Sequence, residues 1–336
     1  FPTRRSSDLF RVWHGSSKAL LMRAAELTRT GIGLPAYYND EVIIPALVHR
    51  GATMDEARNY NIIGCVEPQV PGKTDGWHDA AFFNMCRPLE LVFSNGMDKG
   101  ELVGIQTGDV TKMTTFEEFF DAYKKQMEYC ISLMVNADNA IDVAHSERVP
   151  LPYESCMVDD CLSRGLSVQE GGAVYNFTGP QGFGIANMAD SLYAIRKLVY
   201  EDKKVSMEEY KQALAWNYDK GLDQQSVSDM SEMILKGMQD AGMAVNTDTA
   251  KAVLQTVMRL KPTEDQLRRF TEIHHMIDEV PKFGNAIDDV DYFARDVAYT
   301  YSRPLQKYMN PRGGHYQAGL YPVSANVPLG GQTGAD

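Results

Sequence analysis

Short apolar or β-branched segments alternate with longer segments of helical periodicity along this chain, and no other feature limits its fold as strongly. The strand-like segments lie at residues 60–64, 173–177 and 320–327. A Ser or Thr followed three residues later by Glu or Gln marks a helix start, and this spacing occurs at Thr53, Thr115, Ser206 and Thr263. Strands that alternate with helices predict an α/β fold. The lack of a linker or internal repeat predicts one domain.

Two helical regions stand out. After Thr115, apolar side chains recur at helical intervals: Phe116, Phe119, Tyr123, Met127, Cys130 and Met134. Residues 222–277 are different, because they are polar, rich in Met and Gln, and helical in pattern throughout. We expect residues 222–277 to form a helical insertion on the surface of the domain.

The composition excludes several classes of protein. The chain has 336 residues, of which 44% are hydrophobic, and a formal net charge of −12, which argues against a nucleic-acid partner. No apolar run is long enough for a membrane span. The five cysteines include no C-x-x-C pair, so we predict neither disulfides nor structural zinc, and we place the protein in a reducing cytoplasm. Cys156 and Cys161 are predicted to be buried thiols on one helix. No metal site is predicted.

The segment NIIGCVEPQ, residues 61–69, places Cys65 two positions before Glu67. Gly64 and Pro68 interrupt regular structure there, so both side chains can reach one small space at the end of a strand. A nearby carboxylate disfavours a thiolate, so the pair does not indicate a nucleophilic cysteine. It fits a cysteine that handles hydrogen atoms beside a general base that handles protons. The alternative is a buried thiol and an acid that caps a helix.

Other polar residues are weaker candidates. His78 could serve Cys65 as a base, but no Asn or Asp accompanies them in a hydrolase arrangement. His145 is more simply interpreted as a structural histidine. The glycine-rich residues 171–187 lack the spacing of a P-loop or a dinucleotide site, so we predict a strand and a tight turn there.

Residues 64–84, GCVEPQVPGKTDGWHDAAFFN, resemble the cysteine loop of the glycyl radical enzymes. The resemblance is strongest to the diol dehydratase branch, the glycerol and 1,2-propanediol dehydratases that work without vitamin B12. It continues through residues 137–161, 171–187, 281–291 and 310–327. Most of residues 222–277 look inserted relative to these dehydratases.

The resemblance implies a fold and an activity. The fold would be part of the ten-stranded glycyl radical enzyme (pyruvate formate-lyase-like) barrel, an α/β barrel surrounded by helices. The activity would be that of a lyase that dehydrates a small diol, glycerol or propane-1,2-diol, to an aldehyde. Cys65 would become a thiyl radical, Glu67 would act as general base, and Asp79 would bind a substrate hydroxyl. His78 and Tyr321 are implied as further substrate contacts.

Cofactors and partners are implied in the same way. The cofactor would be a protein-derived glycyl radical, with no metal or vitamin B12 in this chain. The partner would be a radical SAM activating enzyme with an iron–sulfur cluster, and the full-length protein would be a homodimer. We expect no nucleic acid and no membrane as partner. The location would be the cytoplasm, or a bacterial microcompartment within it.

Alternatives remain open. Isethionate sulfite-lyases bind a sulfonate through arginines, one of them near a position where this chain has Gln317 and Ala318, which favours a neutral diol. Choline trimethylamine-lyase shares the sequence GCVEPQ. An inactive fragment or a non-catalytic interaction module is a further alternative, although a scaffold has no need of Cys65 together with Glu67.

Both ends of the chain look unusual. Residues 1–9, FPTRRSSDL, have no periodicity and match one reading frame of a common sequencing adapter, so we expect an artefact there. No segment matches the C-terminal glycine motif of the family, and we expect that glycine radical domain to be absent. Residues 10–336 would then be an internal part of a longer protein, a partial barrel domain that is inactive alone.

Overall fold

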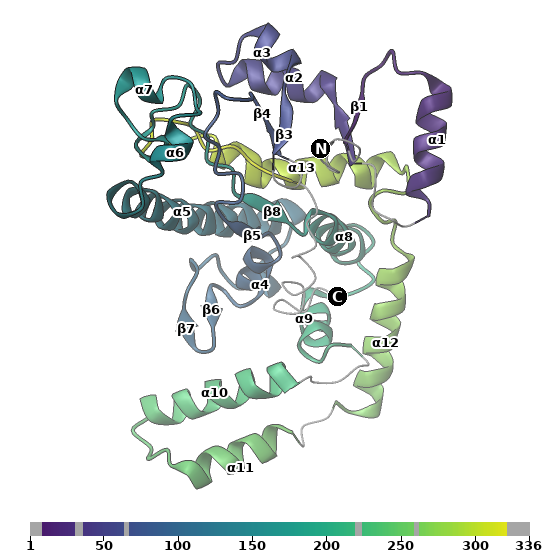
Figure 1. The fold of residues 1–336 in the computed structure, drawn as a ribbon. Coiled ribbons are helices and arrows are strands. Elements are labelled where there is room, and N and C mark those ends of the chain that lie inside the picture. Colours follow the sequence, from purple (N-terminus) through teal and green to yellow (C-terminus); the bar gives the residue numbers. More distant parts are fainter. Residues whose placement is uncertain (1–8, 31–35, 64–66, 219–223, 259–261, 321–336) are drawn as a thin grey trace. The chain divides into compact units, whose positions relative to one another are not determined.

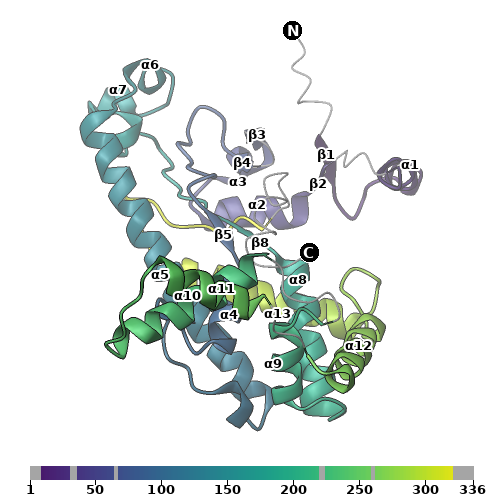
Figure 2. The same cartoon turned by 90° about the horizontal axis from the view of Figure 1, so that it is seen from below.

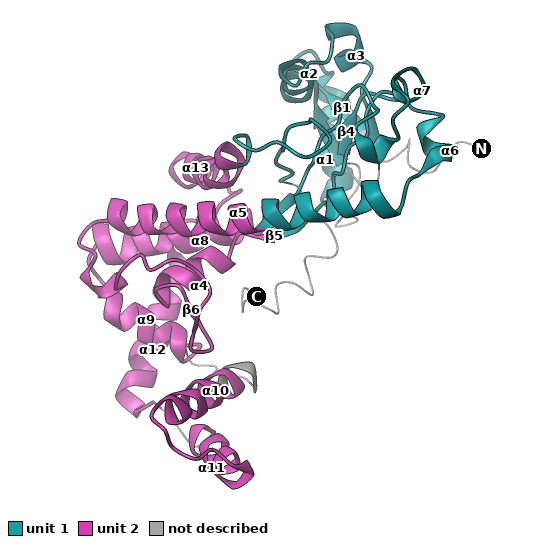
Figure 3. Ribbon diagram, turned by 90° about the vertical axis from the view of Figure 1, so that its left-hand side faces the viewer, with its two compact units in different colours: residues 1–83, 134–182, 305–324 teal, residues 84–133, 183–304, 325–336 magenta. Residues whose placement is uncertain are grey.

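The computed structural model describes residues 9–30, 36–63, 67–218, 224–258 and 262–320 (Figure 1). Their contacts divide the chain into two compact units, which Figure 3 colours separately. Unit 1 comprises residues 1–83, 134–182 and 305–324, and unit 2 comprises residues 84–133, 183–304 and 325–336. Each unit is therefore assembled from stretches that are distant in the sequence.

Unit 1 contains two pairs of strands. β1 (Leu9–Val12) and β2 (Ala36–Asn39) are parallel, and β3 (Asn61–Ile63) and β4 (Glu67–Gln69) are antiparallel. The short helical elements of this unit are α1 (Lys18–Thr28), α2 (Asp40–His49), α3 (Met54–Arg58), α6 (Pro152–Ser155), α7 (Cys161–Arg164) and the 3-10 turn η3 (Val168–Glu170). In Figure 2, α2 and α3 lie close to β3 and β4. The apolar core there consists of Tyr38, Leu47, Ala52, Ala57, Tyr60 and Val70.

Unit 2 is largely helical. Its elements include the 3-10 turn η2 (Val110–Lys112), the π-helical turn η4 (Arg196–Glu201) and the antiparallel strands β6 (Met97–Asp98) and β7 (Glu101–Leu102). Its α-helices are α4 (Arg87–Phe93), α8 (Ile185–Ile195), α9 (Met207–Ala215), α10 (Gln224–Asp240), α11 (Thr247–Val257), α12 (Glu264–Glu279) and most of α13 (Asp288–Leu305). Helices α10, α11 and α12 cover most of the described part of residues 222–277, where the sequence predicts a helical insertion. Figure 1 shows α10 and α11 side by side.

Helix α5 (Phe116–Arg148) contributes to both units, with the division after Leu133. It begins where the sequence predicts, because the Thr115 hydroxyl accepts the Glu118 N–H at 3.2 Å and the Glu118 carboxylate accepts the Thr115 N–H at 3.3 Å. The reciprocal caps expected at Thr53, Ser206 and Thr263 are also present. The apolar periodicity is confirmed by Phe119, Tyr123 and Met127, which are all fully buried.

The predicted strands are only partly present. The segment 60–64 supplies β3, and β5 (Phe82–Asn84) pairs with β8 (Gln181–Phe183). Residues 173–177 form no strand; they make an isolated bridge at Tyr175 and are followed by another at Thr178. Side chains also bond two carbonyls of this segment: Asn310 donates to Asn176 O, and Arg312 donates to Phe177 O, which accepts the Trp77 N–H as well. Apart from Leu320, residues 320–327 lie outside the described residues.

No helix within the described ranges is long and apolar enough to cross a lipid bilayer.

Candidate active site

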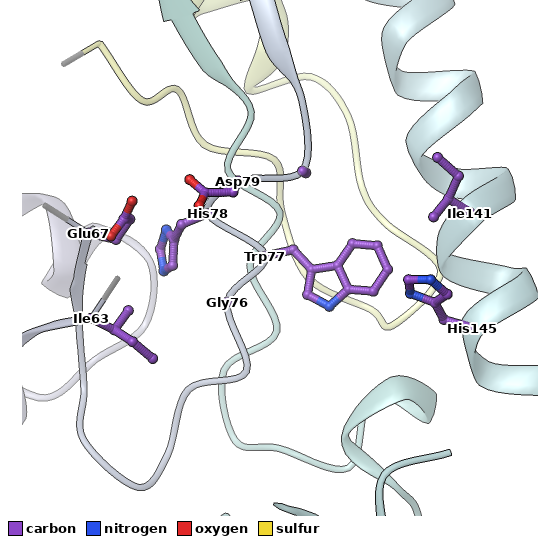
Figure 4. A pocket seen from close by; sticks show the side chains of 9 residues that line it. Ile63, Glu67, Gly76, Trp77, His78, Asp79, Ile141 and His145 are labelled. Carbon is purple, nitrogen blue, oxygen red and sulfur yellow. The ribbon is translucent and has the colours of Figure 1, made fainter. Parts of the chain in front are cut away.

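A pocket of about 430 Å³ lies in unit 1. Three residues predicted from the sequence, Glu67, His78 and Asp79, line it together. Figure 4 shows their side chains gathered at one side of the pocket. The remaining lining residues are Ile63, Gly76, Trp77, Ala80, Ile141 and His145.

Glu67 reaches the pocket from the β3–β4 pair. The antiparallel register pairs Ile63 with Glu67 and Asn61 with Gln69. Ile63 and Glu67 both line the pocket, and Glu67 is only 1% exposed. Cys65 lies outside the described residues, but its nearest described neighbours on either side are these two lining residues.

Backbone pairing with residues 175–178 holds the segment that carries the other two predicted residues. The Trp77 N–H donates to Phe177 O at 3.0 Å, and Trp77 forms a parallel bridge with Thr178. Position 76, directly before Trp77, requires glycine, because a Cβ there would collide with the His78 ring. The pairing thus determines where His78 enters the pocket.

Gln181, the first residue of β8, joins the two acids. Its Nε2 donates to Glu67 Oε1 at 3.4 Å, to the Asp79 carboxylate, and to the backbone carbonyl of His78 at 3.3 Å. The Gln181 side chain is buried. One amide therefore holds a carboxyl group from strand β4 and another from the segment after Trp77 near a single nitrogen atom. Sequence reasoning missed Gln181, and its position in the glycine-rich segment was the signal available.

His78 is neutral at ordinary pH. Burial lowers the pKa of His78 to about 4, and the charge of Arg312 adds to this effect. Its Nδ1 lies 3.3 Å from Gln317 Nε2. Its Nε2 is buried and has no hydrogen-bond partner among the described residues. The ring can therefore bond a ligand at Nε2 without bringing a positive charge to the carboxylates.

Trp77 and His145 form the opposite side of the pocket. Their rings meet edge to face, with centroids 4.9 Å apart and an interplanar angle of 61°. His145 and Ile141 belong to α5, and Figure 4 shows both facing the Trp77 indole. The interpretation of His145 as purely structural did not anticipate this position.

Arg312 supports the Trp77 side of the pocket. Its guanidinium lies 5.1 Å from the centroid of the Trp77 ring and is 1% exposed. It forms ion pairs with Asp75 at 2.6 Å and Asp142 at 3.0 Å. It also donates to the Asp75 backbone carbonyl at 2.9 Å. A buried charge needs such partners, and the sequence did not single out this one.

Two of the described residues that line the pocket are acids, and none of them is Lys or Arg. No group of three or more His, Cys, Asp or Glu side chains within the described ranges is arranged to hold a metal ion.

Two predicted site residues, Cys65 and Tyr321, lie outside the described residues, so their placement stays a prediction. The prediction for Cys156 and Cys161 is wrong in part. Cys161 is buried in α7, whereas Cys156 follows the end of the separate helix α6 and is exposed. Residues 157–160 interrupt the helical backbone, and Asp160 has a φ of 75°, in the left-handed region. One continuous helix therefore cannot carry both thiols.

Comparison with known proteins gives the family. The model of the pyruvate formate lyase-like family matches residues 4–330. The chain belongs to the pyruvate formate lyase-like family. The predicted membership and the predicted α/β barrel fold of the glycyl radical enzymes are thereby confirmed.

Solved structures of this family superimpose closely on the chain. A structure concerning 1,2-propanediol dehydration in Roseburia inulinivorans has 69% identity and a TM-score of 0.90, over 96% of this chain and 38% of that one. The B12-independent glycerol dehydratase from Clostridium butyricum, with glycerol bound, has 46% identity and a TM-score of 0.76, over 96% and 35%.

Curated relatives in the family differ in their reactions. (2S)-3-Sulfopropanediol dehydratase of Klebsiella oxytoca is 31% identical over 94% of this chain and 33% of its own length. Isethionate sulfite-lyase of Oleidesulfovibrio alaskensis is 32% identical over 98% and 34%. The chain thus spans about a third of the length of the relatives it matches.

Proposed function

We propose that this chain carries part of the active site of a glycyl radical lyase that dehydrates a small neutral diol, glycerol or propane-1,2-diol, to an aldehyde. The observation that carries the proposal is a pocket in which Glu67 and Asp79 share the amide of Gln181, with neither Lys nor Arg among its described lining residues. The 69% identity with a structure concerning 1,2-propanediol dehydration supports a diol as substrate.

The chain has a place for radical chemistry at Cys65. A glycyl radical, when present, supplies the unpaired electron that lets a cysteine sulfur take a hydrogen atom. Covalent geometry keeps the Cα atoms of Cys65 and Glu67 within about 7 Å of each other. Because Ile63 and Glu67 both line the pocket, our proposal assigns the Cys65 thiol to a ligand bound there.

In the proposed reaction, Cys65 transfers the hydrogen atom and Glu67 transfers the proton. Cys65 takes a hydrogen atom from C1 of the diol, and Glu67 takes the proton of the C1 hydroxyl. The C2 hydroxyl leaves as water with that proton. Return of the hydrogen atom from Cys65 to C2 completes the aldehyde, so that one diol yields one aldehyde and one water.

Other residues hold the substrate. The Asp79 carboxylate accepts a hydrogen bond from one hydroxyl, and neutral His78 bonds a hydroxyl through Nε2. Tyr321 is a further proposed contact. A neutral diol suits this lining because an anionic sulfonate would meet two carboxyl groups, with neither Lys nor Arg among the described lining residues to pair with it.

The activity belongs, in this proposal, to a full-length protein of which this chain is about a third. That protein would receive its glycyl radical from a radical SAM activating enzyme with an iron–sulfur cluster, would be a homodimer, and would act in the cytoplasm or a bacterial microcompartment. Residues 222–277 would be an insertion relative to other diol dehydratases. This segment alone would be inactive.

Isethionate sulfite-lyase activity is the second candidate, because those relatives reach 32% identity with the chain. The test is to activate the full-length protein anaerobically and supply glycerol, propane-1,2-diol, isethionate and choline in turn. We expect an aldehyde from at least one diol. Cys65→Ser should abolish turnover and leave the glycyl radical signal in the electron paramagnetic resonance spectrum. Release of sulfite from isethionate with no dehydration of either diol would overturn the dehydratase assignment.

A further inference from the structure

The backbone of Gln181 is held firmly without help from its side chain. Its N–H donates to Ala81 O at 2.7 Å, and the residue pairs with Gly319 through a parallel bridge. The next residue, Gly182, donates its N–H to Gly319 O at 2.8 Å. Main-chain hydrogen bonds on both sides therefore fix the position of the Gln181 Cα. A substitution can replace the side-chain amide while leaving these main-chain bonds in place.

The chemistry of its neighbours determines how the Gln181 amide is oriented. Its Nε2 faces an oxygen of the Glu67 carboxyl group, an oxygen of the Asp79 carboxyl group and the His78 carbonyl, and all three oxygens act as acceptors. With the amide reversed, its oxygen would face three acceptors. In the observed orientation Oε1 is buried with no partner among the described residues. The site thus keeps an unpaired oxygen, which is unfavourable, in order to present both hydrogens of the amide.

We propose that Gln181 is a positioning residue that keeps the buried Glu67 carboxylate ionised and directed toward Asp79. The proposal deepens the dehydratase function and rests on it for its catalytic consequence. Without the amide, two carboxylates would share one space without their common donor, and like charges in one site favour uptake of a proton. Glu67 would take that proton, because it is 1% exposed whereas Asp79 is exposed. A protonated Glu67 cannot act as a base.

The direct test is infrared spectroscopy of the full-length protein without activation, so that no turnover is needed. Gln181→Met removes the amide and preserves the length of the side chain. At pH 8, the difference spectrum of this variant against the wild type should show the C=O stretching band of one protonated carboxyl group. The band should vanish in the double variant Gln181→Met/Glu67→Gln. The matched control is Gln169→Met, since Gln169 is also buried in unit 1 but bonds Leu151 N–H and does not line the pocket.

Kinetics of the activated protein supply the second readout. We expect Gln181→Met to lower kcat by at least tenfold and Gln169→Met to leave it unchanged. No carboxyl band in Gln181→Met, or an equal band in Gln169→Met, would refute the positioning role. If Gln181→Met does not fold, Gln181→Asn replaces it, because the shorter amide cannot reach both acids and should produce the same band. A band without diol turnover in the wild type would refute the dehydratase function and leave the positioning role standing.

Discussion

Two acids of the same chemistry occupy different surroundings in the pocket. Glu67 is buried at the start of β4, whereas Asp79 is exposed at the end of the segment that pairs with residues 175–178. Both bond the amide of Gln181. Burial excludes water from a base, and exposure leaves a carboxylate free to bind an incoming hydroxyl. The pair can therefore divide the roles of base and binding group.

Kinetics of two amide variants should separate these roles. Glu67→Gln keeps the shape but removes the base, so kcat of the activated full-length protein should fall about 10²- to 10⁴-fold with little change in KM. Asp79→Asn weakens a charge-assisted hydrogen bond worth about 1.5–3 kcal/mol, so its main effect should be on kcat/KM. Steady-state assays with each diol measure both parameters. Glu147→Gln, an exposed acid of α5 outside the pocket, is the control. Identical kinetic losses in Glu67→Gln and Asp79→Asn would contradict the division of roles.

At the scale of an element, α5 brings buried acids close to the pocket. Ile141 and His145 line the pocket, and Asp138 and Asp142 are buried one turn apart on the same helix. One carboxylate oxygen of Asp142 pairs with Arg312, while the other, like one carboxylate oxygen of Asp138, is buried with no partner among the described residues. Burial raises the pKa of Asp138 to about 7, and the charge of Asp142 adds to the shift.

This raised pKa makes stability depend on pH. The native protein binds the Asp138 proton up to about pH 7, whereas an unfolded Asp releases it near pH 4. The native state therefore holds more protons between these values, and the contribution of Asp138 to the free energy of unfolding falls as pH rises, by at most about 4 kcal/mol. Asp138→Asn mimics the protonated form. It should match the wild type near pH 4 and exceed its stability at pH 8.

Urea denaturation at a series of pH values measures this difference. Asp121→Asn is the matched control, since Asp121 lies on the same helix with its side chain 59% exposed. Its difference from the wild type should stay nearly constant with pH. If the difference in free energy of unfolding between Asp138→Asn and the wild type is also independent of pH, then Asp138 does not hold a proton in the native state between pH 4 and pH 8, and the prediction is wrong.

At the scale of the whole molecule, unit 1 depends on contacts between distant stretches of sequence. It is formed by residues 1–83, 134–182 and 305–324. Arg312 belongs to the third stretch and bonds the other two, through Asp75 in the first and Asp142 in the second. It also donates to Phe177 O at 2.9 Å. One side chain therefore connects all three stretches behind the pocket.

Replacing this arginine should weaken unit 1 strongly. Arg312→Lys keeps the charge but cannot reproduce the planar fork of donors, and breaking a buried ion pair typically costs about 3–5 kcal/mol. Urea denaturation should therefore show a loss of this size. Arg295→Lys is the control, because Arg295 pairs with Asp296 on the surface with 54% of its side chain exposed. The change there should stay within about 0.5 kcal/mol. Equal stability of the two variants would contradict the connecting role of Arg312.

The sequence alone was sufficient for features that depend on near neighbours. The caps at Thr53, Thr115, Ser206 and Thr263 were predicted because a capping box needs only four consecutive residues. Glu67 and Asp79 were identified from one continuous motif, and both line the pocket. Family membership followed from the same motif.

Only the tertiary structure shows the features that depend on residues far apart in the sequence. Gln181 and Arg312 carry no local pattern, and they matter because folding brings them to acids that lie 102 and 237 positions away in the sequence. His145 lines the pocket because α5 presents it to Trp77. The segment 173–177, where a strand was expected, pairs only through an isolated bridge, and the distant side chains of Asn310 and Arg312 bond two of its carbonyls. The local sequence determines helix and strand propensity and the helix caps. The hydrogen-bond partner of a buried polar group, in contrast, is whichever residue the fold brings next to it.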